Sequence, residues 1–267
     1  MSPDDGAPAR SKHPDERHRA ILTTLREAGR VDSEEMARQL GVTGETVRKD
    51  LIRLESLGRL RRVRGGAALP ESISYEAEVS LRLEFSHEKS RIAVAALDRI
   101  PVAGAIYIDA GSTTERFASR IPPQRELTVY THALSVANAV IDHPRLEVYL
   151  LGGRLRRTTL ANVGSATEHA LAEVNVDVAF LGTNGISATR GLTTPDPEEA
   201  SVKRAVLSSA RERVLLCDHS KFGVVSGMQH ATLDDLDVLI TDREPPAELQ
   251  RALDRSGVRC EVVQAAG

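Results

Sequence analysis

The chain has 267 residues, and this length predicts about two domains. Hydrophobic residues make up 41% of it, but aromatic residues only 3% and Trp is absent, so aliphatic side chains must do the packing. The two cysteines lack a CxxC or Cys/His spacing, so we expect no metal site, no disulfide framework and no cofactor. The polar N-terminus and the lack of a long apolar run argue against a signal peptide or membrane segment, so we expect a cytoplasmic protein.

Charge is divided unevenly along the chain. Residues 1–15 are rich in Pro, Asp and Ser and predict a disordered arm. Residues 16–64 carry 12 Lys and Arg against 8 Asp and Glu, a net charge of +4, whereas residues 65–267 carry 21 against 27, a net charge of −6. A basic N-terminal part on an acidic body indicates nucleic-acid contacts at one end. We place a first domain at residues 16–69.

Two short amphipathic helices are predicted in the basic part. The first spans Arg17–Ala28, whose apolar residues recur on one face. The second spans Ser33–Leu40, and Asp32 before it can accept hydrogen bonds from its free amides. Gly41 then supplies a left-handed turn residue that ends the second helix.

A third helix, after Thr43, has the features of a DNA-recognition helix. The Thr43 hydroxyl can accept from the amides of the first turn, and Val47, Leu51 and Leu54 form one inward stripe. Polar and basic side chains lie off this stripe, where a helix-turn-helix presents its recognition helix to the major groove. The DNA contacts expected from this helix are Thr43, Glu45, Thr46, Arg48, Lys49 and Arg53. Asp50 is acidic beside phosphate, so we expect it to orient a neighbouring arginine instead.

An arginine-rich segment follows the third helix. Four arginines occur in six residues, interleaved with Leu60 and Val63 and closed by glycines, which predicts a short β-wing lying on phosphate. The expected wing contacts are Arg61, Arg62 and Arg64. The alternative is a three-helix module that uses its arginines as a solvated face, and the wing makes this alternative the weaker one.

The pattern changes beyond the wing. Residues 70–91 predict a mostly solvated linker with a helix, and residues 92–267 a second domain. In that domain, apolar runs alternate with helical patterns, which is typical of an α/β fold with a largely parallel sheet. The predicted strands span residues 105–109, 127–130, 146–151, 176–181, 213–217 and 236–240.

Polar residues follow several of these strands, at the carboxyl ends where parallel sheets bind ligands. The Gly111–Thr114 turn lies between a strand and a helix start and suits an anion, although a helix capped by Ser or Thr is ordinary. Three further strand ends carry Thr131-His132, Gly182–Gly185 and Asp218–Phe222. The alternatives are a surface Lys221 paired with Asp218, and loop histidines held by hydrogen bonds at positions 132 and 219.

The chain resembles the DeoR family of bacterial transcriptional repressors. In the N-terminal part the resemblance rests on Arg17, Ile21, Leu25, Thr43, the run Thr46–Leu51 and the run Arg62–Ala67. The family usually has Ser in place of Thr43, which keeps the hydroxyl cap. The resemblance covers nearly the whole chain and implies a winged helix-turn-helix domain.

The second part resembles the DeoR effector domain, which is similar in fold to ribose-5-phosphate isomerase and binds phosphorylated sugars. By this resemblance Ser112–Thr114 would hold the phosphate, and Asp109, Asn184 and Lys221 would reach sugar hydroxyls. The family commonly has Thr-Asn where this chain has Thr131-His132, which changes the polarity of the expected pocket. The effector residues expected in full are Asp109, Gly111, Ser112, Thr113, Thr114, Thr131, His132, Gly152, Gly182, Asn184 and Lys221.

The run Gly191–Asp196 resembles members that control fructose use, so fructose 1-phosphate is the expected effector. An isomerase would need a carboxylate base beside the substrate, and isomerases carry an Asp-Gly-Ala-Asp-Glu loop where this chain has Gly182–Gly185. We therefore expect binding without turnover; the alternative is a sugar-phosphate isomerase or kinase-like enzyme with an appended DNA-binding head. One helix-turn-helix covers a half-site, so the expected repressor binds double-stranded operator DNA as at least a dimer.

Overall fold

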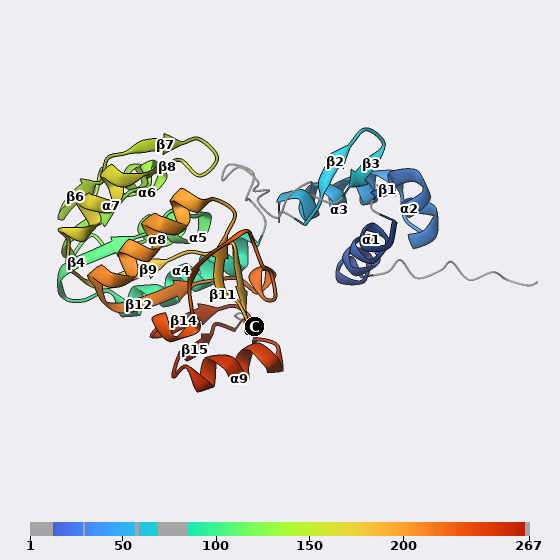
Figure 1. Ribbon diagram of the computed structural model, residues 1–267. Helices are drawn as coiled ribbons and strands as arrows, with labels where there is room; N and C mark the ends of the chain where they lie inside the picture. Colours follow the sequence, from blue (N-terminus) through green and yellow to red (C-terminus); the bar gives the residue numbers. More distant parts are fainter. Residues whose placement is uncertain (1–12, 29, 57–58, 69–84, 265–267) are drawn as a thin grey trace, which may run out of the picture. The chain divides into compact units, whose positions relative to one another are not determined.

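The computed structural model describes residues 13–28, 30–56, 59–68 and 85–264 (Figure 1). The chain divides into two compact units between Ala77 and Glu78. Most of the expected arm and most of the expected linker lie outside the described residues. Each unit is considered by itself.

The N-terminal unit is a three-helix domain with a small antiparallel sheet. The elements are α1 (Pro14–Ala28), β1 (Arg30–Asp32), α2 (Ser33–Leu40), α3 (Gly44–Ser56), β2 (Arg61–Val63) and β3 (Gly66–Ala68). The three helices and the wing predicted from the sequence are confirmed. The wing strands β2 and β3 pair, and β3 also pairs with β1, which the sequence did not predict. Ile21, Leu25, Val47 and Leu51 are among the buried residues of its core.

The first helix begins earlier than predicted. Helix α1 starts at Pro14, so Pro14 and Asp15 are helical and do not belong to an arm. Proline suits the first position of a helix, where an amide would have no partner, and Asp15 and Glu16 place negative charge on the free amides of the first turn. The carbonyl of His13 accepts from the amides of Glu16 and Arg17.

The C-terminal unit is built on a parallel seven-stranded sheet, with the strand order β15-β14-β12-β9-β4-β5-β6. All of its strand pairs are parallel. The six strands predicted from the sequence are confirmed, and the edge strand β15 is additional. The strands are β4 (Ala103–Ile108), β5 (Glu126–Thr131), β6 (Leu146–Leu150), β9 (Val176–Leu181), β12 (Ala210–Leu216), β14 (Val238–Thr241) and β15 (Arg259–Val262).

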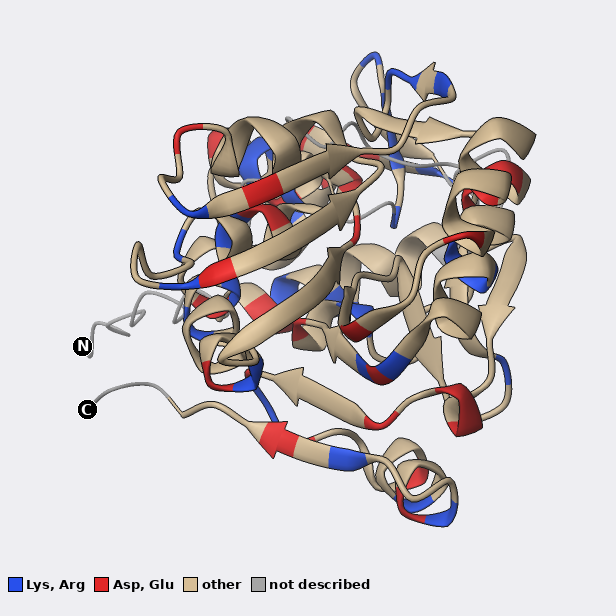
Figure 2. Ribbon diagram, turned by 90° about the vertical axis from the view of Figure 1, so that its left-hand side faces the viewer, with Lys and Arg blue, Asp and Glu red and all other residues tan. Residues whose placement is uncertain are grey.

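Helices cover both faces of this sheet because successive strand residues point to opposite sides. Ile106 and Ile108 of β4 pack in one core with helices α4, α5 and α6, whereas Tyr107 packs in the other with α7, α8 and α9. Charged residues are sparse along the central strands and gather in loops and on helices (Figure 2). The helices are α4 (Ser86–Ala96), α5 (Ser112–Ala118), α6 (Leu134–Val140), α7 (Ser165–Ala172), α8 (Pro197–Ser209) and α9 (Ala247–Arg255).

Helix α4 corrects the predicted linker. Lys89 and Ile92 of this helix are buried, and Ile92 belongs to the core between the sheet and helices α4, α5 and α6. Residues 86–91 are therefore part of the C-terminal fold and not of a solvated linker, because they form the first turns of α4 and the buried face of this helix begins at Lys89.

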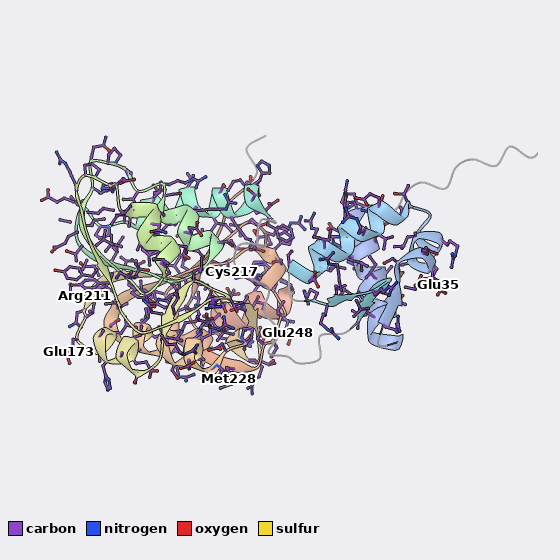
Figure 3. All side chains as sticks on the ribbon, turned by 90° about the horizontal axis from the view of Figure 1, so that it is seen from above. Glu35, Glu173, Arg211, Cys217, Met228 and Glu248 are labelled. Atoms are coloured by element: carbon purple, nitrogen blue, oxygen red, sulfur yellow. The ribbon has the colours of Figure 1, made fainter. Side chains whose placement is uncertain are left out.

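Smaller elements complete the C-terminal unit. They are the hairpin β7 (Arg154–Arg156) and β8 (Ala161–Val163), an antiparallel sheet of β10 (Gly185–Ser187), β11 (Gly191–Thr194) and β13 (Met228–Ala231), and the 3-10 turns η2 (Leu97–Arg99), η3 (His219–Lys221) and η4 (Leu233–Asp235). Cys217 lies buried among the packed side chains of this unit, as a small apolar residue would (Figure 3). Within the described parts of the chain, no helix has the length and apolar character to cross a membrane.

Candidate functional site

The recognition helix α3 has the N-terminal cap and the buried apolar face that its sequence predicts. The Thr43 hydroxyl accepts from the Thr46 amide at 3.2 Å. Val47, Leu51 and Leu54 are buried, which leaves the predicted DNA-contacting side chains on the exposed and half-exposed side of the helix. The helix therefore presents its polar face to solvent from a fixed start.

Two of the predicted DNA-binding arginines are held by carboxylates, of which Glu45 is exposed and Glu55 half-buried. Arg48 donates to Glu45 at 2.7 and 2.8 Å, one turn away on α3. On the wing, the Arg62 guanidinium lies 2.5 Å from Glu55 and its amide donates to the same carboxylate at 2.7 Å. Exposed ion pairs contribute at most about 1 kcal/mol, so Arg48 can exchange Glu45 for a base edge at little cost.

Arg48 and Arg62 are expected to act differently on DNA. Arg48→Ala should cost about 1–3 kcal/mol on the specific site and relax discrimination, because a base contact carries sequence information. Arg62→Ala should weaken binding to all DNA sequences alike and flatten the dependence of affinity on salt, because a phosphate contact carries no sequence information. Titrations of both variants on operator and random DNA at several salt concentrations measure this. Equal losses on both DNAs for Arg48→Ala would contradict the assignment.

Asp50 holds the recognition helix against the first helix. Its carboxylate accepts from Arg17 at 2.7 and 3.1 Å and lies 3.0 Å from His18 Nε2. The Arg17 and Asp50 side chains are only 10% and 7% exposed. The expectation that Asp50 orients an arginine is thereby confirmed, and the partner is Arg17 of α1.

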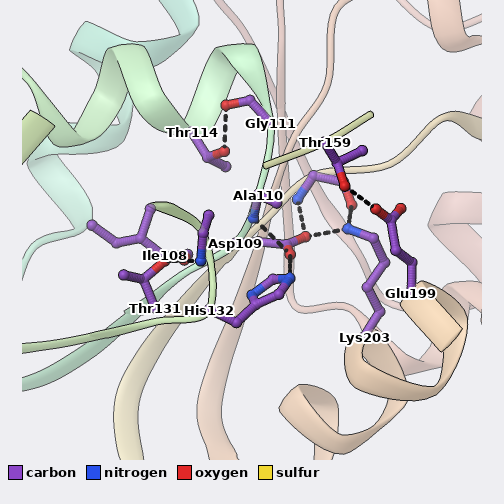
Figure 4. A network of polar contacts seen from close by, with 12 residues as sticks. Ile108, Asp109, Ala110, Gly111, Thr114, Thr131, His132, Thr159, Glu199 and Lys203 are labelled. Carbon is purple, nitrogen blue, oxygen red and sulfur yellow. Dashed lines mark hydrogen bonds and ion pairs between the residues drawn. The ribbon is translucent and has the colours of Figure 1, made fainter. Parts of the chain in front are cut away.

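The carboxyl ends of β4 and β9 form the switch point of the large sheet. From these neighbouring strands the chain continues to β5 and β6 on one side and to β12, β14 and β15 on the other. Ligands of open parallel sheets bind beyond such a point. The next residues, Asp109 and Gly182, are joined directly, because Asp109 Oδ2 accepts from the Gly182 amide at 2.9 Å and Oδ1 from the Ala110 amide at 2.9 Å (Figure 4).

Lys203 of α8 completes this arrangement. Its ammonium forms an ion pair with Asp109 Oδ2 and donates to the Gly182 carbonyl at 3.0 Å. Lys203 is 5% exposed and Asp109 0%. Burial raises the pKa of Asp109, but the charges of Lys203 and His132 and the hydrogen bonds from Lys203 and Gly182 outweigh it, so the pKa lies below its usual value. The group is therefore a buried carboxylate with a paired cation.

Glu199 lies one turn before Lys203 and is also buried. It accepts from the Thr159 hydroxyl and from Arg156 at 3.1 Å, so the β7–β8 hairpin is fastened to α8. Sequence reasoning missed both Glu199 and Lys203. The available signal was their spacing, since Glu199, Lys203 and Val206 share one helical stripe, where charged residues need buried partners.

His132 is enclosed next to the ion pair. Its Nδ1 lies 2.5 Å from the Tyr107 hydroxyl and its Nε2 lies 3.9 Å from Asp109 Oδ1. Burial lowers the pKa of His132 to about 4. Burial, with the nearby carboxylates of Asp109 and Glu199, also raises the pKa of Tyr107 well above its usual value. Both side chains are therefore neutral at physiological pH.

Acid should destabilise the C-terminal fold through His132. The residue binds a proton below pH 6.5 in the unfolded chain but only below about 4 in the folded one. Stability therefore falls as pH decreases through this window, by about 2 kcal/mol at pH 5 from this residue. Urea midpoints at pH 7 and pH 5 for the wild type and His132→Asn measure the effect. Parallel pH dependences of the two proteins would contradict it.

The remaining predicted effector residues differ in exposure and in hydrogen bonding. Thr131 is engaged inside the fold, since its hydroxyl donates to the Ile108 carbonyl at 2.7 Å and accepts from the Ala133 amide at 3.1 Å. Thr114 likewise donates to the Gly111 carbonyl at 2.9 Å. The half-exposed group contains Gly111, Ser112, Gly182, Asn184 and Lys221, while Thr113 is buried and Gly152 exposed.

The loop after β12 contains Asp218 and Lys221, for which an ion pair was the alternative to ligand binding. In the structure the Asp218 carboxylate accepts from the Ser220 amide at 3.0 Å. His219 is a hydrogen-bonded loop histidine, with its amide and Nδ1 at 2.8 and 2.6 Å from Asp242. Its ring also meets that of Phe85 edge-on at 4.9 Å.

Comparison with known proteins identifies the two units. Residues 17–73 match the DeoR-like helix-turn-helix domain, and residues 84–243 match the DeoR C terminal sensor domain. The chain belongs to the DeoR family. The HTH-type transcriptional repressor GlcR of Bacillus subtilis (strain 168) is 35% identical over 94% of this chain and 96% of its own length. The glycerol-3-phosphate regulon repressor of Escherichia coli (strain K12) is 30% identical over 92% of this chain and 98% of its own length.

These relatives confirm a DNA-binding DeoR-type transcriptional repressor over the enzyme alternative, because they are regulators matched over almost the full chain. Among solved structures, ribose 5-phosphate isomerase A from Methanocaldococcus jannaschii aligns with a TM-score of 0.37 and 18% identity. That alignment covers 50% of this chain and 52% of the isomerase and carries no argument about function.

Proposed function

We propose that this DeoR-family repressor binds operator DNA with its N-terminal domain and is released when a phosphorylated sugar occupies the switch point of its sensor domain. The observation that carries the proposal is the buried Lys203 at the ends of β4 and β9, next to the helix start at Ser112. The free amides of α5 favour an anion, and Lys203 balances the charge of the Asp109 carboxylate at the same strand ends. Ser112–Thr114 would hold the phosphate, and Asp109, Asn184 and Lys221 would face the sugar hydroxyls.

Fructose 1-phosphate is the favoured effector. The support is the resemblance of Gly191–Asp196 to members that control fructose use, together with the place of this run beside the switch point. Thr194 donates to Asn184 at 3.0 Å, and Asp196 caps α8 about two turns ahead of Lys203. Because one relative is a glycerol-3-phosphate regulon repressor, glycerol 3-phosphate is the ligand to compare first.

The proposal is tested with fructose 1-phosphate, glycerol 3-phosphate, free fructose and inorganic phosphate. A ligand that binds only the folded state raises the melting temperature by mass action, and it must bind the two states of the repressor unequally to release DNA. We expect sugar phosphates to do both and free fructose neither. Isomerase turnover of any of these compounds, or operator release by none of them, would overturn it.

Lys221 tests whether the loop after β12 belongs to the site. Lys221→Ala should leave operator affinity unchanged without ligand, because the residue lies outside the DNA-binding domain. It should raise the fructose 1-phosphate concentration needed for release, through loss of a charge-assisted contact of about 1.5–3 kcal/mol. Ser112→Ala should act in the same direction but less, since amides still hold the phosphate. Release at the wild-type concentration would make Lys221 a surface lysine.

A second copy of the chain is part of the proposal. One helix-turn-helix reads a half-site, so repeated or palindromic operator halves need at least a dimer. Light scattering of the free protein and of its operator complex gives the stoichiometry directly.

A further inference from the structure

A donor and an acceptor face each other across a gap at the switch point. His132 Nε2 and Asp109 Oδ1 are 3.9 Å apart, which is too far for a direct hydrogen bond (Figure 4). His132 is 1% exposed and Asp109 0%, yet Ala110 and Gly182, which both donate to Asp109, are partly exposed. Solvent therefore reaches within one residue of the gap.

The Tyr107 contact links the tautomer of His132 to the direction of one hydrogen bond. The phenol is protonated, and its hydroxyl lies 2.5 Å from Nδ1 in the buried core. A neutral imidazole has one donor and one acceptor nitrogen. With Tyr107 donating to Nδ1, the proton lies on Nε2, so the nitrogen that faces Asp109 is a donor.

Asp109 keeps acceptor capacity on the same side. Its Oδ2 takes the Gly182 amide and the Lys203 ammonium, whereas Oδ1 takes the Ala110 amide. A carboxylate oxygen accepts about two hydrogen bonds, which leaves room on Oδ1. A hydroxyl group can accept a hydrogen bond from His132 Nε2 and donate one to Asp109 Oδ1. With ordinary hydrogen-bond lengths of about 2.7–2.9 Å, its oxygen spans both atoms at an angle near 90°.

We propose that His132 and Asp109 form a hydroxyl-recognition pair, in which one hydroxyl of a sugar-phosphate effector accepts from His132 Nε2 and donates to Asp109 Oδ1. This rests on the proposed function of the site and specifies the ligand chemistry further. Tyr107 is a positioning residue that fixes the tautomer of His132. An effector without this hydroxyl leaves the His132 donor without its ligand partner, which should weaken binding by about 10- to 100-fold.

The ligand test compares fructose 1-phosphate with its monodeoxy analogues by calorimetry. In the wild type one deoxy position should lose about 10- to 100-fold in affinity, and in His132→Phe that same analogue and fructose 1-phosphate should bind alike. His143→Phe is the matched control, because His143 bonds the Pro122 carbonyl at 3.1 Å in the loop before β6. It should keep the wild-type discrimination.

The tautomer test needs no ligand. Nitrogen-15 NMR of the imidazoles should show His132 protonated on Nε2 in the wild type and a mixture of tautomers in Tyr107→Phe. The Tyr107→Phe variant should also lose part of the discrimination against the deoxy analogue.

Three outcomes overturn the inference and separate it from the proposed function. A proton on Nδ1 of wild-type His132 removes its chemical basis. Tight binding of fructose 1-phosphate with equal affinity for every deoxy analogue leaves the proposed function standing and shows that the gap holds only water. If the wild type binds neither fructose 1-phosphate nor glycerol 3-phosphate, the proposed function fails and the inference fails with it.

Discussion

Lys203→Met is expected to lower the free energy of unfolding of the sensor domain by about 3–5 kcal/mol, because it leaves the buried Asp109 carboxylate without its cation. Methionine keeps most of the length of the lysine side chain, so the loss reports the charge and not a cavity. Near-UV circular dichroism in urea measures it, since the chain has no Trp and three of its four tyrosines, Tyr107, Tyr130 and Tyr149, lie in this domain.

Two further variants make this result decisive. Lys221→Met removes a half-exposed lysine from the same domain and should cost less than about 1 kcal/mol. Adding Asp109→Asn to Lys203→Met removes the stranded charge and should recover part of the loss, which a double-mutant cycle expresses as a coupling energy. Equal losses for Lys203→Met and Lys221→Met would show that the buried pair contributes nothing to stability.

Asp50→Ala should have a comparable effect on the DNA-binding domain. It leaves the Arg17 guanidinium and His18 without their carboxylate in the seam between α1 and α3, at an expected cost of about 3–5 kcal/mol. Operator affinity should fall although Asp50 is not expected to touch DNA, because the recognition helix loses its support. Hydrogen exchange of α3 amides in the full chain should accelerate at least about 100-fold, with α8 amides as the internal reference.

Glu45→Ala is the matched control for stability. It breaks the exposed Arg48 pair on the same helix and should cost at most about 1 kcal/mol. Unchanged exchange of α3 in Asp50→Ala would contradict a structural role for the buried pair.

The parts of the fold that the sequence predicts are those with local signals. The wing carries closing glycines, the recognition helix a hydroxyl cap, and the central strands run apolar on both faces, because parallel strands are buried on both sides. Strand β1 could not be predicted, since Arg30–Asp32 is three residues long and forms only by pairing with Gly66–Ala68 far along the chain. Strand β15 was missed because Arg259 and Glu261 make this edge strand look polar.

The sequence predicts the position of the candidate site in the sheet better than it predicts the contacts within the site. The strands themselves were predicted correctly, and the α/β pattern fixes the edge of the sheet at which their carboxyl ends gather. Lys203 was missed because its partner Asp109 lies 94 residues away, and only the assembled sheet brings them together. The engagement of Thr131 with the Ile108 carbonyl was equally hidden, since a hydroxyl at a strand end suits a ligand as well as the backbone of the neighbouring strand.

The β1–β3 pairing has a consequence for how the repressor can be switched. Strand β1 runs directly into Asp32, which caps α2, and a Cβ on Gly66 of β3 would lie only 1.9 Å from the Val31 carbonyl oxygen. Among the described residues, the wing is thus tied to the helix-turn-helix through the pairing of β3 with β1. We expect the domain to bind DNA in a single conformation, so that release appears as a higher dissociation rate of the whole domain.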